Sequence, residues 1–219
     1  MLSTTTLFEE FIYDTSDNSV YESFNSLEND KYIKGNFPFR KRAFCTGLLS
    51  QNSIVWDSTS SEFFQDTAHN NYAGNIDRRF AIAGRVIRDH VGLLLLSPMH
   101  HRFFGDSSWI IGLHQIRIVC DANNSGYPAP EGSHQDGFDF VITYCVNQSN
   151  ITGGETSLSL GAADGPIVLR RTLQIGEAII VNDKSLFHYT TPINVASEAD
   201  GFRDMCIITL NTATSVLGR

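Results

Sequence analysis

The sequence has 219 residues, of which 42% are hydrophobic and 18% are charged, and its formal net charge is −8 at pH 7. This composition is typical of a folded globular protein with a well-buried core, and it excludes a disordered chain. The acidic balance argues against a nucleic-acid backbone or an anionic membrane surface as the main partner.

The sequence also lacks the features of a membrane or exported protein. No apolar run approaches the roughly 20 residues needed to span a bilayer, and the first segment, MLSTTTLFEEFIYD, lacks the basic region of a signal peptide. The cysteines Cys45, Cys120, Cys145 and Cys206 are widely spaced and form no CxxC pair. We interpret them as small core residues in a reducing compartment, which predicts a cytoplasmic protein.

The first half of the chain contains patterns that favour helices. Residues 4–12, 18–27 and 76–96 carry apolar side chains at roughly helical spacing. No repeat or linker divides the chain. We therefore expect one domain over residues 1–219, in which a helix-rich part, residues 1–108, packs on the remainder.

From Trp109 onward the pattern changes to short β-rich runs separated by turn residues. Apolar side chains alternate within these runs, and loops rich in Gly, Asn and Pro divide them. The expected strands are 113–120, 137–146, 155–160, 176–183 and 204–210. No later gap is long enough for a crossover helix, so we expect a mainly β fold, an antiparallel double sheet over 109–212 with flanking helices.

The stretch SHQDGFDF carries the first functional signal. His134 and Asp136 stand two residues apart just before an apolar run, and residues at this spacing in a strand point to the same face. The H-x-D pattern occurs often by chance, so alone it is weak evidence for a metal site.

A second histidine strengthens this interpretation. His188 follows the expected strand 176–183 after a short turn. Two histidines and one carboxylate form the facial triad of non-haem Fe(II) oxygenases, which leaves three coordination positions open. We therefore predict that His134, Asp136 and His188 bind Fe(II), since these ligands suit Fe(II) better than Ca²⁺ or Mg²⁺.

Arg203 begins the last strong β run, in GFRDMCIITL. Its planar guanidinium can hold a carboxylate through two parallel hydrogen bonds. The far carboxylate of a 2-oxoglutarate co-substrate needs such an anchor. The alternative is a surface arginine that pairs with Asp200 or Asp204.

Several separate blocks of the sequence resemble one family. PEGSHQDGFDFV, NITGGET, VNDKSLFHYTTPI and GFRDMCIITL occur in this order, and KRAF, FFQDTAHNNYAGNIDRRF and LHQIRI precede them. Together they resemble the bacterial 2-oxoglutarate/Fe(II) dioxygenases that include isoleucine hydroxylase and related free L-amino-acid hydroxylases. The resemblance extends over residues 30–211 or so.

The resemblance implies a cupin-like core of the double-stranded β-helix type, which is also called a jelly roll. It implies His134, Asp136 and His188 as iron ligands, Arg203 as the anchor of 2-oxoglutarate, and O₂ as the oxidant. It further implies hydroxylation of an unactivated C–H bond in a small substrate, a free aliphatic amino acid.

Other functions remain open at this point. The same chemistry serves desaturation or epoxidation of a larger metabolite in natural-product tailoring. A non-catalytic jelly roll that binds a metabolite is a further alternative, although an intact triad and an intact Arg203 argue against it. A hydrolase or cupin with Zn²⁺ or Mn²⁺ would not need the arginine anchor.

Three polar residues near these motifs are candidates for contacts with carboxylates or amines. Glu131 stands three residues before His134 and can receive a substrate ammonium group, or it can lie in a solvated loop. Gln115 and Arg117 share one face of LHQIRI. If this face lines the barrel, they contact a carboxylate of 2-oxoglutarate or of the substrate; a buried structural arginine is the alternative.

The upstream stretch HNNYAGNIDRRF is rich in hydrogen-bonding groups. We expect Asn70, Tyr72 and Arg78 to form a substrate lid or pocket wall, with a well-bonded loop as the alternative. Phe138 and Trp109 are candidate pocket aromatics, although aromatic residues in a β core more often serve packing.

Overall fold

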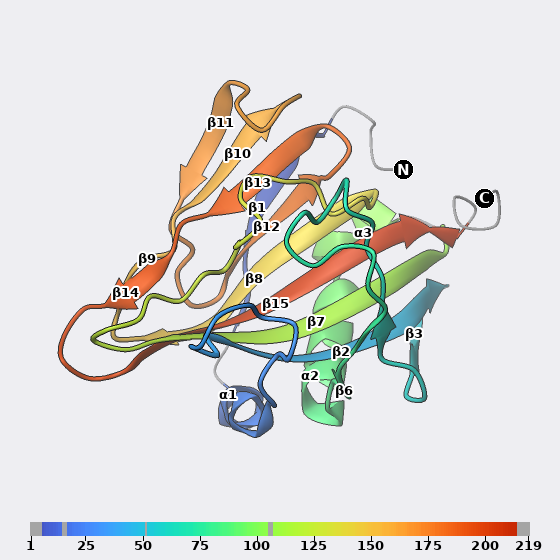
Figure 1. Ribbon diagram of the computed structural model, residues 1–219. Coiled ribbons are helices and arrows are strands. Elements are labelled where there is room, and N and C mark those ends of the chain that lie inside the picture. The colour runs from blue at the N-terminus through green and yellow to red at the C-terminus, as the bar shows by residue number, and fades with distance from the viewer. Residues whose placement is uncertain (1–5, 15–16, 51, 105–106, 214–219) are drawn as a thin grey trace.

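The computed structural model describes residues 6–14, 17–50, 52–104 and 107–213. Its largest layer is an eight-stranded sheet (Figure 1), in which all pairings are antiparallel except that of β6 with β2. In spatial order its strands are β1 (Phe8–Ile12), β12 (Glu177–Asn182), β8 (Phe140–Ser149), β15 (Gly201–Thr212), β7 (Trp109–Cys120), β2 (Arg40–Ser50) and β3 (Ser53–Asp57), with β6 (Ala81–Ile82) beside β2.

Smaller sheets complete the β structure. The strands β11 (Ile167–Arg171), β10 (Thr156–Leu160) and β13 (Leu186–Thr190) pair in that order. Two further pairs are β14 (Ile193–Val195) with β9 (Ile151–Gly153), and β4 (Glu62–Phe63) with β5 (Arg78–Arg79). Cys145 and Met205 of the main sheet share a buried cluster with Leu158 and Leu186, so the β10–β13 sheet packs on one face of the main sheet.

The helices cover the opposite face of the main sheet (Figure 1). They are α1 (Asn18–Ser23), continued by the 3₁₀ turn η1 (Phe24–Ser26), α2 (Arg85–Leu95) and α3 (Pro98–Phe104). Ile87, Val91 and Leu95 form the buried stripe of α2 and join Leu113 and Ile142 in the largest apolar cluster. Among the described residues, no helix is long and apolar enough to cross a bilayer.

The alternation of side chains along the strands separates the two faces, as predicted. In β8, Ile142 and Tyr144 enter the cluster under the helices, whereas Cys145 enters the cluster between the sheets. All five predicted strands are present, with ends shifted by a few residues. The prediction of helices outside an antiparallel β core is therefore confirmed.

The N-terminal half contains more strand than its pattern predicted. The helix expected over 4–12 is wrong where the chain is described, because Phe8–Ile12 pairs with β12 as an edge strand. The helix expected over 76–96 begins only at Arg85, after Gly84 in an extended conformation. Pairing partners that are distant in sequence override local helical spacing in both segments. Helix 18–27 is confirmed, as α1 and η1.

We predict that Ile87→Ala lowers the free energy of unfolding by about 2–5 kcal/mol, because it leaves a cavity beneath α2. Ile87 is fully buried, whereas Leu93 of the same helix is 74% exposed. Leu93→Ala is therefore the matched control, with an expected change within about 0.5 kcal/mol. Urea denaturation of both variants measures the difference, and equal losses would contradict the packing described for α2.

Candidate active site

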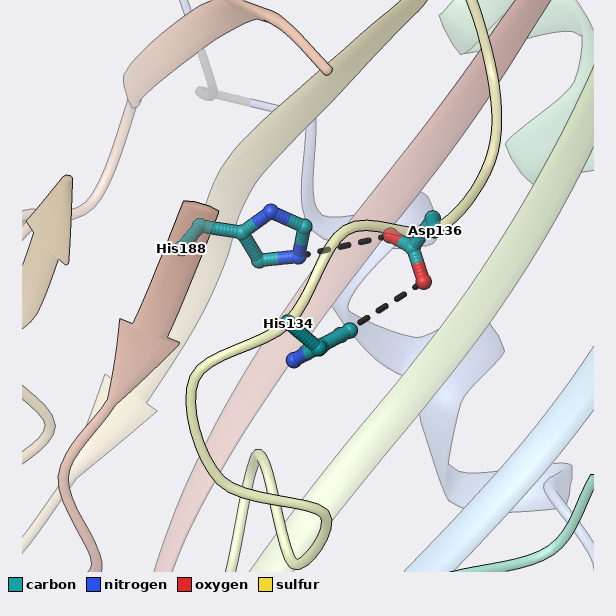
Figure 2. A group of neighbouring side chains, drawn as sticks. All are labelled: His134, Asp136 and His188. Carbon is teal, nitrogen blue, oxygen red and sulfur yellow. Dashed lines mark ion pairs between the residues drawn. The ribbon is translucent and has the colours of Figure 1, made fainter. Parts of the chain in front are cut away.

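Three predicted metal ligands converge between the sheets. One ligand atom from each of His134, Asp136 and His188 lies within 4.8 Å of the others. The two oxygens of Asp136 point to different histidines, at 3.5 Å from Nε2 of His134 and 3.4 Å from Nε2 of His188 (Figure 2). The three side chains that were predicted to bind Fe(II) therefore lie close enough together to share one metal ion.

A short backbone bridge brings the two histidines together. The N–H of His134 donates to the carbonyl of His188 at 3.1 Å, and the N–H of His188 donates back at 2.9 Å. Residues paired in this antiparallel manner project their side chains to the same face. The imidazole centroids are accordingly 4.3 Å apart.

The hydrogen bonds of the site suit a transition metal. Nδ1 of His134 lies 2.9 Å from the carbonyl oxygen of Gly132, which can only accept. Nδ1 therefore carries a proton, which leaves Nε2, the nitrogen that faces Asp136, as the atom that can bind a metal once it loses its own proton. Two imidazole nitrogens and one carboxylate on one side of a cavity are the donor set of a facial triad, so the residues fit Fe(II).

The charges within the site are strongly coupled. Burial lowers the pKa of His134, but hydrogen bonding and charge from Asp136, with the charge of Glu131, raise it to about 9. Burial acts to raise the pKa of Asp136, yet hydrogen bonds from His134 and His188 hold it well below its usual range. Asp136 is therefore a carboxylate. A divalent cation would replace the protons that the histidines share with it.

Asp183 holds the loop that carries Asp136, a role that the sequence did not reveal. Its carboxylate accepts the backbone N–H groups of Asp136 at 3.1 Å, Gly137 at 2.7 Å and Phe138 at 2.9 Å. The same carboxylate lies 3.7 Å from Nδ1 of His188. Burial and the charge of Asp136 raise the pKa of Asp183. One buried side chain thus contacts both segments that carry predicted ligands.

Arg203 lies in the same cavity, which has a volume of about 120 Å³. Its side chain is 1% exposed and donates to the carbonyls of Gly154 at 2.6 Å and Leu173 at 3.0 Å. Among the described residues, no carboxylate forms an ion pair with it, since Asp204 pairs with Arg117. The alternative of a surface arginine is therefore wrong.

Gln115 and Arg117 do not reach this cavity. Gln115 donates to the hydroxyl of Ser23 at 2.9 Å, and Arg117 binds both oxygens of Asp204 at 2.6 and 2.7 Å. Both side chains thus lie on the helix-covered face of β7. The prediction that they contact a co-substrate or substrate carboxylate is corrected, because His114 and its alternate neighbours line the cavity instead.

The predicted substrate residues divide into two groups. Glu131 and Asn70 line the cavity, and Oε1 of Glu131 lies 3.2 Å from Nε2 of His134. The cavity lining does not include Tyr72, whose hydroxyl binds the backbone of Lys34, or Phe138. The predictions for these two residues are corrected, because neither lines the cavity.

Trp109, the other candidate aromatic, packs in the main core. Its indole N–H donates to the carbonyl of Phe104 at 3.1 Å. The packing alternative therefore holds for this residue.

Further cavity residues come from segments that are distant in sequence from the triad. Gln65 donates to Oδ1 of Asp136 at 3.0 Å and accepts a hydrogen bond from Arg78 at 2.8 Å. Arg42 lies 2.6 Å from Nδ1 of His114, and Arg40 also lines the cavity. Alternation in RKRAF places Arg40 and Arg42 on one face, but it does not reveal which face borders the cavity.

Comparison with known proteins identifies the family. A family model described as 2OG-Fe dioxygenase matches residues 21–209. The chain belongs to the 2OG-Fe dioxygenase family. This family uses Fe(II), 2-oxoglutarate and O₂, so the chain is an oxidoreductase with these cofactors.

A more specific relative covers only part of the chain. L-isoleucine-4-hydroxylase of Bacillus thuringiensis is 27% identical over 104 residues, which are 47% of this chain and 42% of the relative. The chain thus matches less than half of that enzyme's length. The match supports the family and leaves the substrate to be established.

Solved structures share the fold of this 2OG-Fe dioxygenase. A bsmA homolog from Methylobium petroleophilum PM1 has a TM-score of 0.76 at 23% identity, covering 90% of this chain and 81% of that one. The structure of IDO from Bacillus thuringiensis has a TM-score of 0.67 at 18% identity, covering 95% and 92%. The predicted jelly-roll core is confirmed.

We predict that Asp183→Asn weakens metal binding about 10- to 100-fold, the usual effect of losing a group that orients ligands. The amide cannot accept all three backbone hydrogen bonds that position Asp136. Binding of Mn(II) by equilibrium dialysis measures the change, and circular dichroism checks the fold. Asp164→Asn, at an exposed loop residue, is the matched control and should bind Mn(II) as the wild type does. Unchanged affinity in Asp183→Asn would contradict the positioning role.

Proposed function

We propose that this 2OG-Fe dioxygenase hydroxylates an unactivated C–H bond of a free L-amino acid. His134, Asp136 and His188 hold Fe(II), and Arg203 binds the far carboxylate of 2-oxoglutarate. The observation that carries this proposal is the convergence of the three ligand atoms beside a buried arginine that has no carboxylate partner among the described residues.

The position of Arg203 favours its role as the anchor. Two carbonyl oxygens, of Gly154 and Leu173, fix the guanidinium, while its Nε has no hydrogen-bond partner. A buried cation without a counterion is costly, and a dianionic co-substrate would relieve that cost. When bound, iron supplies the activation of O₂, and the chain orients both substrates and excludes water.

The substrate assignment depends on the remaining cavity groups. Glu131 is mostly buried beside His134 and can receive an ammonium group, and Asn70 forms part of the wall. The partial match to L-isoleucine-4-hydroxylase supports an amino acid as the substrate class. The four cysteines are buried free thiols, which supports a cytoplasmic location as part of this proposal.

We predict that the Fe(II)-loaded protein forms succinate from 2-oxoglutarate in air, and that one free L-amino acid accelerates this and gains one oxygen atom. A panel of the amino acids, tested singly by mass spectrometry, measures both products. Asp136→Ala should form no hydroxylated product, because it removes the anionic ligand. Full activity in that variant would remove Asp136 from the ligand set. If only a larger metabolite accelerated succinate formation and gained the oxygen atom, the amino-acid assignment would be wrong.

We also predict that Arg203→Gln raises the KM for 2-oxoglutarate about 10- to 100-fold, the value of a charge-assisted hydrogen bond. Arg203→Lys should fall between wild type and Arg203→Gln, since it keeps the charge and loses the planar fork. Arg170→Gln, at an exposed arginine, is the control. An unchanged KM in Arg203→Gln would place the co-substrate elsewhere.

A further inference from the structure

Arg42 and Arg78 are buried in the cavity wall and pair only with neutral groups. They are 7% and 1% exposed. Arg42 bonds to Nδ1 of His114, and Arg78 donates to the side-chain oxygen of Gln65. Burial and the charge of Arg42 hold the pKa of His114 well below its usual range, so this imidazole is neutral. The Nε atoms of both arginines have no hydrogen-bond partner.

Arg40, a third arginine of the same wall, differs from Arg42 and Arg78 because it has a carboxylate partner. Arg40 donates to Oδ2 of Asp30 at 2.8 Å, and both side chains are almost fully buried. For Arg42 and Arg78, no such ion pair exists within the part of the chain that the structure describes. Buried cations require a counter-charge, so an anion that enters the cavity would complete this wall.

The two guanidinium groups are held close to each other. Both lie over the ring of Phe63, at 5.2 Å for Arg42 and 4.7 Å for Arg78. Phe80 packs against Arg42 as well, at 4.5 Å. Aromatic contacts of this kind orient the planar groups and leave their N–H edges available. Burial, and after it the positive charge of Arg40, lower the pKa of Arg42 to about 9.

This arginine pair is separate from the position of Arg203. Arg203 lies on β15 and Arg42 on β2, and β7 runs between them. Neighbouring strands are about 4.8 Å apart, so roughly 10 Å separates the two backbones. Ile116 pairs with Met205 on one side and with Arg42 on the other, and these two apolar residues line the cavity. The carbonyls of Gly154 and Leu173 hold the guanidinium of Arg203, whereas that of Arg42 lies against Nδ1 of His114, so different parts of the wall position the two groups.

The arginine pair is nevertheless linked to the metal ligands. Gln65 accepts a hydrogen bond from Arg78 and donates at 3.0 Å to Oδ1 of Asp136. A group bound at Arg78 therefore lies one side chain away from the triad. A site at Arg78 is therefore suitably placed for the substrate, the molecule that is oxidised.

We propose that Arg42 and Arg78 bind the carboxylate of the substrate, on the side of the cavity away from the 2-oxoglutarate anchor. The inference rests on the proposed function and deepens it. Glu131 lies in the same cavity and would bind the ammonium group, so the site would recognise a free amino acid by both of its charged groups. Amides, esters and residues within a peptide chain, which lack the α-carboxylate, are poor substrates.

The test compares acids with their amides. Oxygen-free protein loaded with Fe(II) and 2-oxoglutarate is titrated with each L-amino acid and with its carboxamide, and the change in visible absorption reports binding. Wild type should bind the best amino acid about 10- to 100-fold more tightly than its carboxamide, the value of a charge-assisted hydrogen bond. This ratio is independent of the fraction of protein that is folded.

The variants Arg42→Gln and Arg78→Gln should each lower this ratio towards one, and Arg78→Lys should retain part of it. Arg79→Gln, at the exposed neighbour that pairs with Glu62, should leave the ratio unchanged. Affinity for 2-oxoglutarate should stay within about twofold of wild type in all variants, because it depends on Arg203.

Any of three results would overturn the inference. The first is equal binding of acid and carboxamide by wild type, and the second is an unchanged ratio in both glutamine variants. Protein that binds and turns over 2-oxoglutarate but binds none of the amino acids would also exclude it. A failure of the proposed function is distinguishable, since it appears as absent 2-oxoglutarate binding and absent succinate.

Discussion

The reciprocal backbone hydrogen bonds between His134 and His188 are the constraint on which the active site depends. They join a loop that precedes β8 to a strand of the smaller sheet, and so they cross between segments that are distant in sequence. Because an antiparallel bridge places opposite side chains on one face, both imidazoles must point to the same space. Asp183 then positions Asp136, the third predicted ligand, because its carboxylate accepts hydrogen bonds from the turn that carries Asp136.

The cavity next to this bridge is organised by charge. Its floor is the inner face of β2, β7 and β15, where apolar residues such as Ile116 separate two groups of arginines. Arg203 and the Arg42–Arg78 pair are buried without carboxylate partners in the described chain, whereas Arg40 and Arg117 have them. In our proposals, Arg203 would bind the far carboxylate of 2-oxoglutarate, and Arg42 and Arg78 would bind the carboxylate of the substrate.

The sequence predicted those features of the fold and the site that depend on local patterns of residues. Alternation located the strands after Trp109, and the H-x-D pattern with His188 and Arg203 gave residues that the fold does gather. Local pattern failed where tertiary pairing decides, as at Phe8–Ile12, which forms an edge strand. It also could not tell which face of β7 borders the cavity, so Gln115 and Arg117 were assigned to the wrong side. Gln65 and Asp183 were missed because their partners are distant in sequence.

The most direct test of this account is a crystal structure of the protein grown without oxygen in the presence of Mn(II) and 2-oxoglutarate. The account predicts one metal bound by His134, Asp136 and His188, with the far carboxylate of 2-oxoglutarate on Arg203 and the Arg42–Arg78 wall left open. Metal held by other residues, or the far carboxylate of 2-oxoglutarate bound at Arg42 and Arg78, would contradict it.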